Sequence, residues 1–320
     1  MPNGDRAREI TNAERTALER MRDVASFVAI AIVFVNSFQL CVLASPRDTV
    51  LACAQTRVPL AFAWAKFMTK TVMKCALVRC RESADVCRER DVMYLCNHRA
   101  WADFFVDVYA TEGRAFTMSR MLVACAFPLF MLPAMFVGAV FGFNRDGVQD
   151  KERLNAALDG HFERFRDVYG GAVVYPEGTR NIRDHSLPLK RGMLRYAHGR
   201  KMRVQCVCIA GKERVFSSHL LSAKRGLTLP IYFSQVVRAD EHDDFEDFYN
   251  EVRAKWDDAW SNAYGVREED LRALAEYEPK ERLVKASTRA DVVAAGGALF
   301  TIACVALACV CALRVAQRLY

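Results

Sequence analysis

The sequence MYLCNHRAWAD, residues 93–103, passes from an uncharged apolar run into a polar loop that carries a histidine and a carboxylate. A second stretch, VVYPEGTR at residues 173–180, passes from an apolar run into a turn with an acid, a glycine, a hydroxyl and a guanidinium. Short apolar runs bounded by turn residues are typical of buried strands. Each stretch therefore predicts a strand whose carboxyl end presents polar side chains.

The same alternation extends over residues 91–210, where short apolar runs alternate with amphipathic segments. We expect buried strands at residues 93–96, 173–175 and 204–209. Residues 151–169 are typical of a helix, because apolar residues recur there at helical spacing: Leu154, Leu158, Phe162 and Phe165. Alternating strands and helices predict an α/β domain with a central mixed sheet flanked by helices.

Two long uncharged stretches lie near the two ends of the sequence. Residues 24–44 contain no charge over 21 positions, and residues 292–313 contain none over 22. A helix of this length spans ~30 Å, which is the thickness of a bilayer core. We therefore predict an N-terminal and a C-terminal membrane helix.

Two further apolar segments are interrupted. Residues 49–68 contain Arg57 and Pro59, so they either cross the membrane or re-enter it as a hairpin with the first helix, and the arginines before residue 24 favour the hairpin. Residues 121–143 are uncharged but contain two prolines. A membrane span there would separate the two polar loops, so we expect a kinked, buried or interfacial helix that leads into a strand.

These features divide the chain into six segments. We expect an N-terminal polar segment (1–23), a membrane helix with a re-entrant or second apolar segment (24–68), the α/β domain (69–265), a polar linker (266–291), a C-terminal membrane helix (292–313) and a tail (314–320).

The charge and cysteine content of the chain indicate which kinds of molecule it is expected to bind. The net charge of +7 suits a surface that meets anionic lipid headgroups. Nucleic acid is not an expected partner, because the chain has no basic run with interleaved aromatic residues and none of the common nucleic-acid-binding motifs. The 12 cysteines include no Cys-x2-Cys pair, so we expect free thiols in a reducing compartment rather than a zinc site.

The His-x4-Asp spacing occurs twice, at His98/Asp103 and at His242/Asp247. The second copy lies in an acidic run without a preceding apolar run, which favours the solvated start of a helix over a metal site. Residues five apart on one helix differ by ~140° around its axis, so His98 must precede the helix that carries Asp103 if the two are to meet. Asp103 would then orient the imidazole, whose other nitrogen can take a proton from an alcohol.

Taken in order, these strings resemble the motifs of the glycerophospholipid acyltransferase family, which includes the 1-acylglycerol-3-phosphate acyltransferases. Residues 97–103 resemble its Asn-His-x4-Asp motif, residues 138–145 (GAVFGFNR) resemble its second motif, and residues 177–180 (EGTR) are identical to its third. Residues 190–192 (KRG) resemble a Lys-x-Gly of the family. Residues 204–209 stand where the fourth motif, a proline-bearing strand, is expected.

Two positions depart from the family pattern. Asn144 replaces the usual apolar or acidic neighbour of the second-motif arginine, which bears on the identity of the acceptor. Residues 205–209 lack the proline of the fourth motif, so that match adds little.

The resemblance implies an enzyme that transfers a fatty acyl group from acyl-CoA to a lysophospholipid. The expected acceptor is 1-acylglycerol 3-phosphate, and the product would be phosphatidic acid. His98 and Asp103 would form a general-base dyad without a covalent intermediate, a metal or a cofactor beyond the co-substrate acyl-CoA.

Five residues are expected to bind substrate. Arg145 and Arg180 would hold the phosphate of the acceptor. Glu177 would orient an arginine or a backbone group, Gly178 would allow close approach of the backbone to ligand, and Thr179 would donate to a phosphate oxygen.

Other functions remain open. The acceptor could be another lysophospholipid or glycerol 3-phosphate, and a catalytically silent membrane protein could keep the same fold to bind lipid. A hydrolase is disfavoured because the chain has no Gly-x-Ser-x-Gly nucleophile motif. We expect an integral membrane protein of the endoplasmic reticulum or an equivalent internal membrane, with its active site facing the cytosol, where acyl-CoA is available.

Overall fold

The computed structural model describes residues 17–51, 56–144 and 151–285, together with scattered positions between 292 and 310. The chain forms two compact units. The first consists of Met1–Ala31, Ala65–Ala115 and Gly170–Lys280, and the second of Ile32–Trp64, Phe116–Tyr169 and Glu281–Tyr320.

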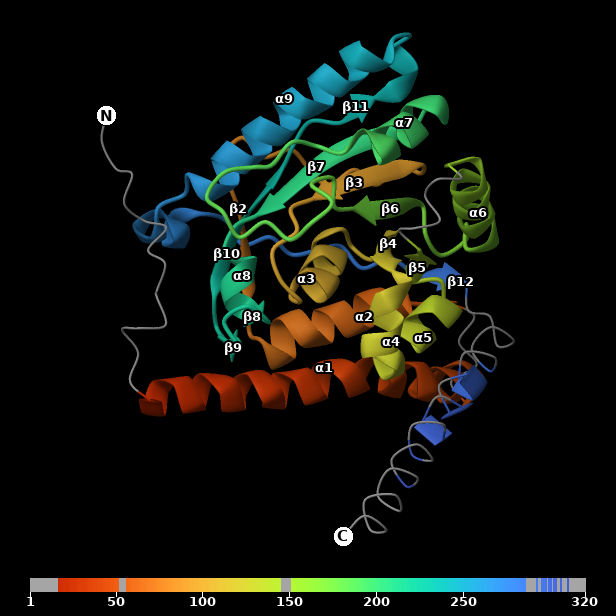
Figure 1. Cartoon of the computed structure of the whole chain (residues 1–320), viewed down its shortest axis with the longest axis vertical. Helices are drawn as coiled ribbons and strands as arrows, with labels where there is room; N and C mark the ends of the chain where they lie inside the picture. The colour runs from red at the N-terminus through yellow and green to blue at the C-terminus, as the bar shows by residue number, and fades with distance from the viewer. Residues whose placement is uncertain are drawn as a thin grey trace. The chain divides into compact units, whose positions relative to one another are not determined.

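A mixed β-sheet forms the centre of the first unit (Figure 1). Its strands follow the order β2-β10-β7-β3-β6, and β11 pairs with the first two residues of β7. β3 lies parallel to both β6 and β7, while β10 runs antiparallel to β7 and parallel to β2. The strands are β2 (Ala76–Arg79), β3 (Val92–Cys96), β6 (Gly171–Val174), β7 (Arg203–Ile209), β10 (Thr228–Phe233) and β11 (Val237–Arg238).

The expected apolar runs are the inner strands of this sheet. Every residue of β3 and β6 is buried, as is every residue of β7 after Arg203. Continuous apolar runs are typical of strands covered on both faces. The mixed sheet flanked by helices confirms the fold class predicted from the sequence.

Helices cover the sheet of the first unit. The longest is α9 (Phe245–Tyr264), which packs on β7 and β10. The Asp244 side chain caps its first turn by accepting from the amides of Glu246 and Asp247, so the acidic run expected to start a helix does so. The same unit contains α3 (Asp103–Ala110), α7 (Arg191–Gly199), α8 (Lys212–Val215) and the short hairpin of β8 (Phe216–Ser217) and β9 (Ser222–Ala223).

The second copy of the His-x4-Asp spacing forms no dyad like the first. His242 pairs through Nε2 with Glu251, at 2.9 Å, on the next turns of α9. Within the described residues, no group of three or more His, Cys, Asp or Glu side chains could hold a metal ion.

The uncharged segment 121–143 does not form one long helix. It consists of α4 (Met121–Ala126), α5 (Pro128–Phe136) and the strand β5 (Val140–Phe143) in the second unit. The break falls at Phe127, because Pro128 cannot continue the α4 ladder and instead begins α5. The expected break at a proline and the strand that follows are present, but two short helices take the place of one kinked helix.

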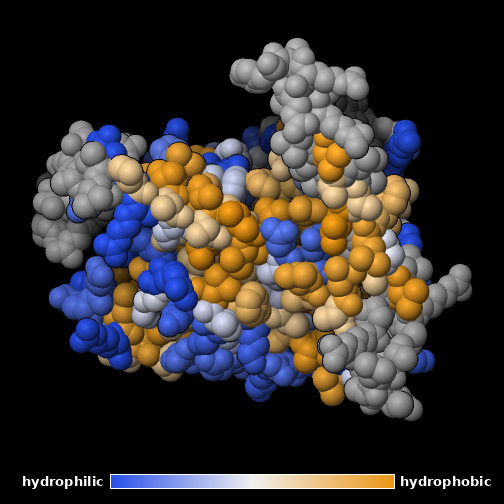
Figure 2. Space-filling view, turned by 90° about the horizontal axis from the view of Figure 1, so that it is seen from below, coloured by the Kyte–Doolittle hydropathy of each residue, from blue (hydrophilic) through white to orange (hydrophobic). Residues whose placement is uncertain are grey.

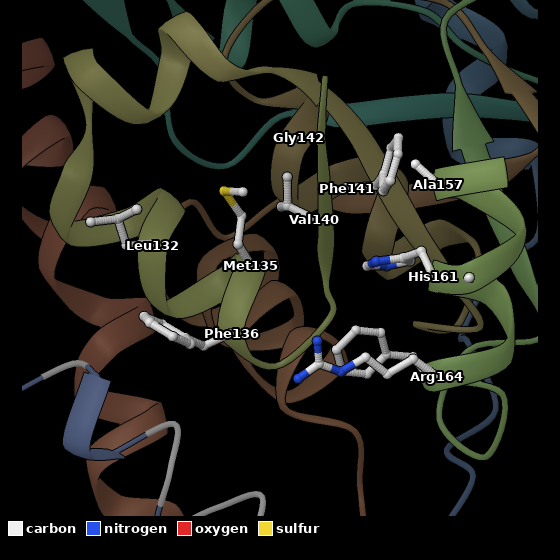
Figure 3. Close-up of a pocket in the computed structure, with 11 residues that line it drawn as sticks. Leu132, Met135, Phe136, Val140, Phe141, Gly142, Ala157, His161 and Arg164 are labelled. Atoms are coloured by element: carbon white, nitrogen blue, oxygen red, sulfur yellow. The ribbon is translucent and has the colours of Figure 1, made fainter. Parts of the chain in front are cut away.

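The second unit also contains a pocket of about 530 Å³ between α5, β5 and α6 (Lys151–Arg164). Figure 3 shows Leu132, Met135 and Phe136 on one side of it and His161 and Arg164 on the other. His161 Nε2 donates to the Gly138 carbonyl, and burial lowers the pKa of His161 to about 4. The imidazole is therefore a neutral part of the packing. β5 pairs in parallel with β4 (Ala115–Arg120), and β1 (Thr56–Arg57) pairs with β12 (Val284–Lys285).

The N-terminal helix α1 (Ala17–Leu51) is apolar on two faces. Its segment Glu19–Ala44 is long and apolar enough to cross a membrane, and it is the one such helix in the part of the chain described. In the first unit, Phe27 packs against the rings of Trp101 and Phe216. In the second unit, Phe34 and Phe38 pack against Trp64 and Phe130.

The other face of α1 carries exposed apolar side chains, which recur at helical spacing: Met21, Val24, Val28, Ile32 and Leu40. Figure 2 looks at this side of the molecule and shows hydrophobic residues gathered there. A membrane crossing by residues 24–44 stays a prediction, as does one by residues 292–313, which lie mostly outside the described residues.

Part of the expected polar linker is built into the first unit. After the 3-10 turn Glu268–Ala273, the chain runs beside β2, where Tyr277 donates its amide to Leu77 O. The Tyr277 hydroxyl donates to Ala110 O at 2.8 Å, and its side chain is buried. Because the average hydrophobicity of this segment is low, the sequence did not indicate that one of its residues, Tyr277, is buried against the sheet.

A buried carboxylate ties this segment to the end of α3. Glu112 is fully buried and accepts from Arg88, Arg114 and the amide of Lys280. Burial would raise the pKa of Glu112, but Arg88 and Arg114 outweigh burial and hold it below its usual value. The charged form of Glu112 therefore stabilises the fold above the pKa that the carboxyl has in the unfolded chain.

Glu112→Gln should lower the free energy of unfolding by about 2–3 kcal/mol at neutral pH, because two guanidiniums lose their buried partner. The loss should shrink as the pH falls through the carboxyl range, where the wild-type group takes up its proton. Thermal unfolding in detergent between pH 4 and 8 measures both effects. Glu276→Gln, which breaks the exposed pair with Lys70, is the control and should cost less than about 0.5 kcal/mol. Equal losses in the two variants would contradict a structural role for Glu112.

Candidate active site

Three strand ends meet at one edge of the sheet in the first unit. β3 pairs in parallel with β6 on one side and with β7 on the other, so their carboxyl ends lie together. The loops that follow these strands carry residues 97–102, 175–190 and 210–211. In open sheets with parallel strands this edge is where binding sites form.

His98 and Asp103 are in direct contact at this edge. His98 lies in the loop after β3, and Asp103 is the first residue of α3, which is the arrangement that helix geometry required. His98 Nδ1 lies 2.7 Å from Asp103 Oδ2. Asp103 is buried, whereas the imidazole is 26% exposed. With Nδ1 occupied, Nε2 is the nitrogen left to exchange a proton with a ligand.

The Asp103 carboxylate also fixes the loop that carries His98. Asp103 Oδ2 accepts from the amides of Arg99, at 2.6 Å, and Ala100, at 3.1 Å. Burial alone would raise the pKa of the Asp103 carboxyl, but Lys212 and His98 outweigh burial and hold the pKa below its usual value. The carboxylate is therefore ionised at neutral pH.

Tyr175 holds the face of the imidazole. Its ring stacks on His98 with centroids 4.3 Å apart and planes inclined by 24°. Tyr175 follows directly after β6, so the parallel pairing of β3 with β6 places the Tyr175 ring next to the His98 ring. The sequence placed Tyr175 in a strand and did not single it out.

The turn after Tyr175 contacts the His98 loop through its backbone. Asn181 N donates to His98 O at 2.8 Å. Glu177 Oε1 accepts from Asn181 Nδ2 and from Leu187 N, at 2.6 and 2.7 Å. Glu177 thus contacts a backbone amide and an asparagine side chain, and among the described residues it accepts no hydrogen bond from an arginine.

The remaining residues of the EGTR string differ in exposure. Gly178 has φ +70, and a Cβ there would lie 3.2 Å from Lys190 Cγ, so a side chain would be strained. Thr179 and Arg180 are exposed, and Arg180 Nη1 donates to Ser218 Oγ at 2.6 Å. Arg180 directly precedes Asn181, the residue whose amide donates to the His98 carbonyl. Arg145 lies outside the described residues.

Arg99 clamps the two loops together. Its guanidinium pairs with Glu213, donates to the carbonyls of Asn181 and Arg183, and lies 5.1 Å from the ring centre of Tyr264. In the sequence, the one indication of a role for Arg99 is its position between His98 and Asp103. The contacts come from segments more than 80 residues away, which no local pattern reveals.

A buried lysine lies beneath the dyad. Lys212 Nζ lies 2.6 Å from Asp107 Oδ1, 2.7 Å from Asn97 O and 3.3 Å from Asp103 Oδ1. Asp107 is one turn after Asp103 on α3, and Lys212 begins α8 after β7. In the sequence, Asp103 and Asp107 stand at helical spacing. Lys212, however, lies in the charged string Lys-Glu-Arg, which is typical of a surface helix, so its burial could not be predicted.

Comparisons with known proteins show what the chain is similar to. Residues 77–210 match the family model described as Acyltransferase. The chain is 22% identical over 163 residues to a 1-acyl-sn-glycerol-3-phosphate acyltransferase of Cocos nucifera, with 50% of each chain covered. It thus spans about half the length of this curated relative.

A solved structure shares the fold. It is that of the 1-acyl-sn-glycerophosphate (LPA) acyltransferase PlsC from Thermotoga maritima, with a TM-score of 0.57 and 14% identity. The match covers 78% of this chain and 98% of that chain. The matched region, residues 77–210, contains the motifs that resemble those of the glycerophospholipid acyltransferases, and the chain shares the fold of the bacterial acyltransferase.

Proposed function

We propose that this protein transfers a fatty acyl group from acyl-CoA to 1-acylglycerol 3-phosphate and so makes phosphatidic acid. The observation that carries the proposal is the contact between His98 and the ionised Asp103, beside the turn that holds Arg180. The names of the coconut relative and of the bacterial structure point to the same acceptor.

His98 is the general base of the proposed reaction. Its Nε2 takes the proton of the acceptor hydroxyl while that oxygen attacks the carbonyl carbon of the thioester. Asp103 holds the imidazole through Nδ1 and stabilises the imidazolium that forms. Collapse of the tetrahedral intermediate breaks the carbon–sulfur bond, and the imidazolium returns its proton to the departing thiolate of CoA. No metal or further cofactor takes part.

Arg180, together with Arg145, binds the phosphate of the acceptor. A guanidinium pairs with phosphate through two parallel hydrogen bonds, and among the described residues exposed Arg180 has a neutral hydroxyl, Ser218 Oγ, as its hydrogen-bond acceptor. A phosphate can displace that hydroxyl at little cost. Thr179, exposed next to Arg180, adds a hydroxyl donor.

The acyl substrates reach the site from a membrane to which α1 binds the protein. Exposed apolar residues on α1 bury favourably in lipid, and the basic net charge suits anionic headgroups. The active site faces the cytosol, where acyl-CoA is available, and the membrane is the endoplasmic reticulum or its equivalent.

Two alternatives lead to different measurements. Another lysophospholipid or glycerol 3-phosphate would be acylated by the same dyad, so a panel of acceptors separates these substrates. A catalytically silent lipid-binding protein would have no use for a buried, ionised carboxylate held against a partly exposed imidazole, and this contact favours the enzyme.

His98→Ala should lower the rate of acyl transfer by about 10²–10⁴-fold, because the route for the hydroxyl proton is lost while little packing is removed. Asp103→Asn should cost nearly as much, since it changes the tautomer and removes the charge that stabilises the imidazolium. The assay uses membranes with labelled acyl-CoA and a panel of lysophospholipids. His242→Ala is the control and should retain the wild-type rate. More than about a tenth of wild-type activity in His98→Ala would exclude the dyad.

Arg180→Ala should raise the KM for the acceptor at least about tenfold and leave the KM for acyl-CoA nearly unchanged. Arg180→Lys should restore activity only in part, because an ammonium keeps the charge but not the planar fork. Arg183→Ala, three residues along the same loop, is the control for general disturbance of the loop. Equal rises in both KM values would argue against phosphate binding by Arg180.

Replacing two exposed residues of α1, as in the double variant Val28→Glu/Ile32→Glu, should release much of the protein from membranes. Charges on this face oppose its burial in lipid by several kcal/mol. The measurement is the fraction of protein that sediments with membranes after a high-salt wash. Leu283→Glu, at another exposed apolar residue, is the matched control and should sediment as the wild type does. Unchanged sedimentation of the α1 variant would refute anchoring through this face.

A further inference from the structure

We propose that Lys212 and Asp107 are positioning residues that set the charge of the His98–Asp103 dyad. Asp107 retains the ammonium group of Lys212, and Asp103 thereby keeps its negative charge for the imidazole. The inference deepens the proposed function, on which its catalytic consequence rests, because it concerns how strong a base His98 is.

The Lys212 ammonium lies closer to Asp107 than to Asp103. Lys212 Nζ lies 2.6 and 2.9 Å from the two oxygens of Asp107, but 3.3 Å from the nearest oxygen of Asp103. That Asp103 oxygen, Oδ1, has no hydrogen-bond partner within the described residues. The ammonium is therefore bonded to Asp107 and only near Asp103.

Hydrogen-bond donors stabilise the charged form of Asp107 against the effect of burial. The Tyr175 hydroxyl donates to Asp107 Oδ2 at 3.1 Å, while Lys212 donates to both oxygens. Burial raises the pKa of Asp107 to about 7, and Lys212 and Tyr175 oppose that rise. Both contacts with the Lys212 ammonium require the Asp107 oxygens to accept, which favours the ionised carboxylate.

Burial makes the balance of charge matter. Lys212 and Asp107 are fully buried and Asp103 is 1% exposed, so water does not screen their interactions. Unpaired charges in such a site cost several kcal/mol. With both aspartates ionised and the lysine protonated, the three groups carry a net charge of −1, which the imidazolium of His98 neutralises.

Other titratable groups face this cluster from the surrounding elements without changing that sum. The guanidinium of Arg99 is paired with Glu213, and burial raises the pKa of the Cys96 and Cys208 thiols, so both stay neutral. Burial likewise raises the pKa of Tyr175. Glu177 is occupied by Asn181 and by the backbone of the third-motif turn.

Replacing either residue alone should weaken His98 as a base, but by different routes. In Asp107→Asn the lysine is left with Asp103 as its carboxylate partner, so the imidazolium is less stabilised. In Lys212→Met two carboxylates face each other without a cation and share a proton, which spreads the remaining negative charge over both of them and leaves less of it at Asp103 for His98. The double variant Asp107→Asn/Lys212→Met restores one carboxylate and a net charge of −1.

The test is a double-variant cycle read through pH profiles. Asp107→Asn should lower kcat about tenfold and move the acidic limb of kcat/KM to lower pH by on the order of one pH unit. The double variant should return that limb toward its wild-type position. Lys212→Met should have the lowest kcat of the three. An unmoved limb in Asp107→Asn, or a larger shift in the same direction in the double variant, would overturn the proposal.

A spectroscopic measurement separates this inference from the proposed function. The protein has six histidines, so its ring signals can be followed by NMR after selective labelling, and His98 is assigned by the signal lost in His98→Ala. The titration midpoint of that signal should move as the acidic limb does, whether or not the acceptor has been identified. Transfer activity that survives in His98→Ala refutes the dyad, whereas an unmoved midpoint in Asp107→Asn refutes only the role of Asp107.

Glu112→Gln supplies the matched control. Glu112 is also a fully buried carboxylate paired with cations, but it lies nine residues beyond Asp103, at the other end of α3. This variant should lose stability without moving the acidic limb or the His98 midpoint. A shift of equal size in Glu112→Gln would mean that general loosening of the fold, rather than charge at Lys212, moves the titration. Thermal unfolding of every variant identifies any that fails to fold, and Asp107→Asn, which keeps the shape of the side chain, then carries the test.

Discussion

The position of β3 between two parallel partners is the constraint on which the site depends. Leu95 pairs with Val174 on β6 and with Cys206 on β7, so three strands end at the same edge of the sheet. The His98 loop, the Tyr175 turn and the Lys212 segment are thereby brought together, although they span more than 100 residues of the sequence. A slip of β3 by one residue would reverse its side chains and separate His98 from Tyr175.

Electrostatics at this edge follow from burial. Asp103, Asp107 and Lys212 lie beneath the partly exposed imidazole, where water cannot reach them. Such charges are costly unless each has a partner, and a polar cluster of this kind must be nearly complete to be stable. The same burial that makes the cluster expensive makes it effective, because a charge placed there acts on His98 without screening.

The fold also contains polar groups that hold the loops of the site in place. Glu177, identical to the acid of the family's third motif, holds Asn181 and Leu187, while Asn181 binds the carbonyl of His98. Arg99 joins the same two loops from the other direction. These residues shape the loops on which His98 and Arg180 are carried, and a substitution in them would disturb both.

Local patterns in the sequence determined the strands, the start of α3 after His98, the break at Pro128 and the grouping of His98 and Asp103, because apolar runs, proline and helix periodicity act over a few residues. The family motifs identified the EGTR turn in the same way. Only the tertiary structure decided that Lys212 pairs with Asp107, that Tyr175 stacks on His98 and that Tyr277 is buried beside β2. Each of these contacts joins residues whose neighbours in the sequence resemble an ordinary surface helix, strand end or linker. Their partners are chosen by strand order and register, which local sequence does not encode.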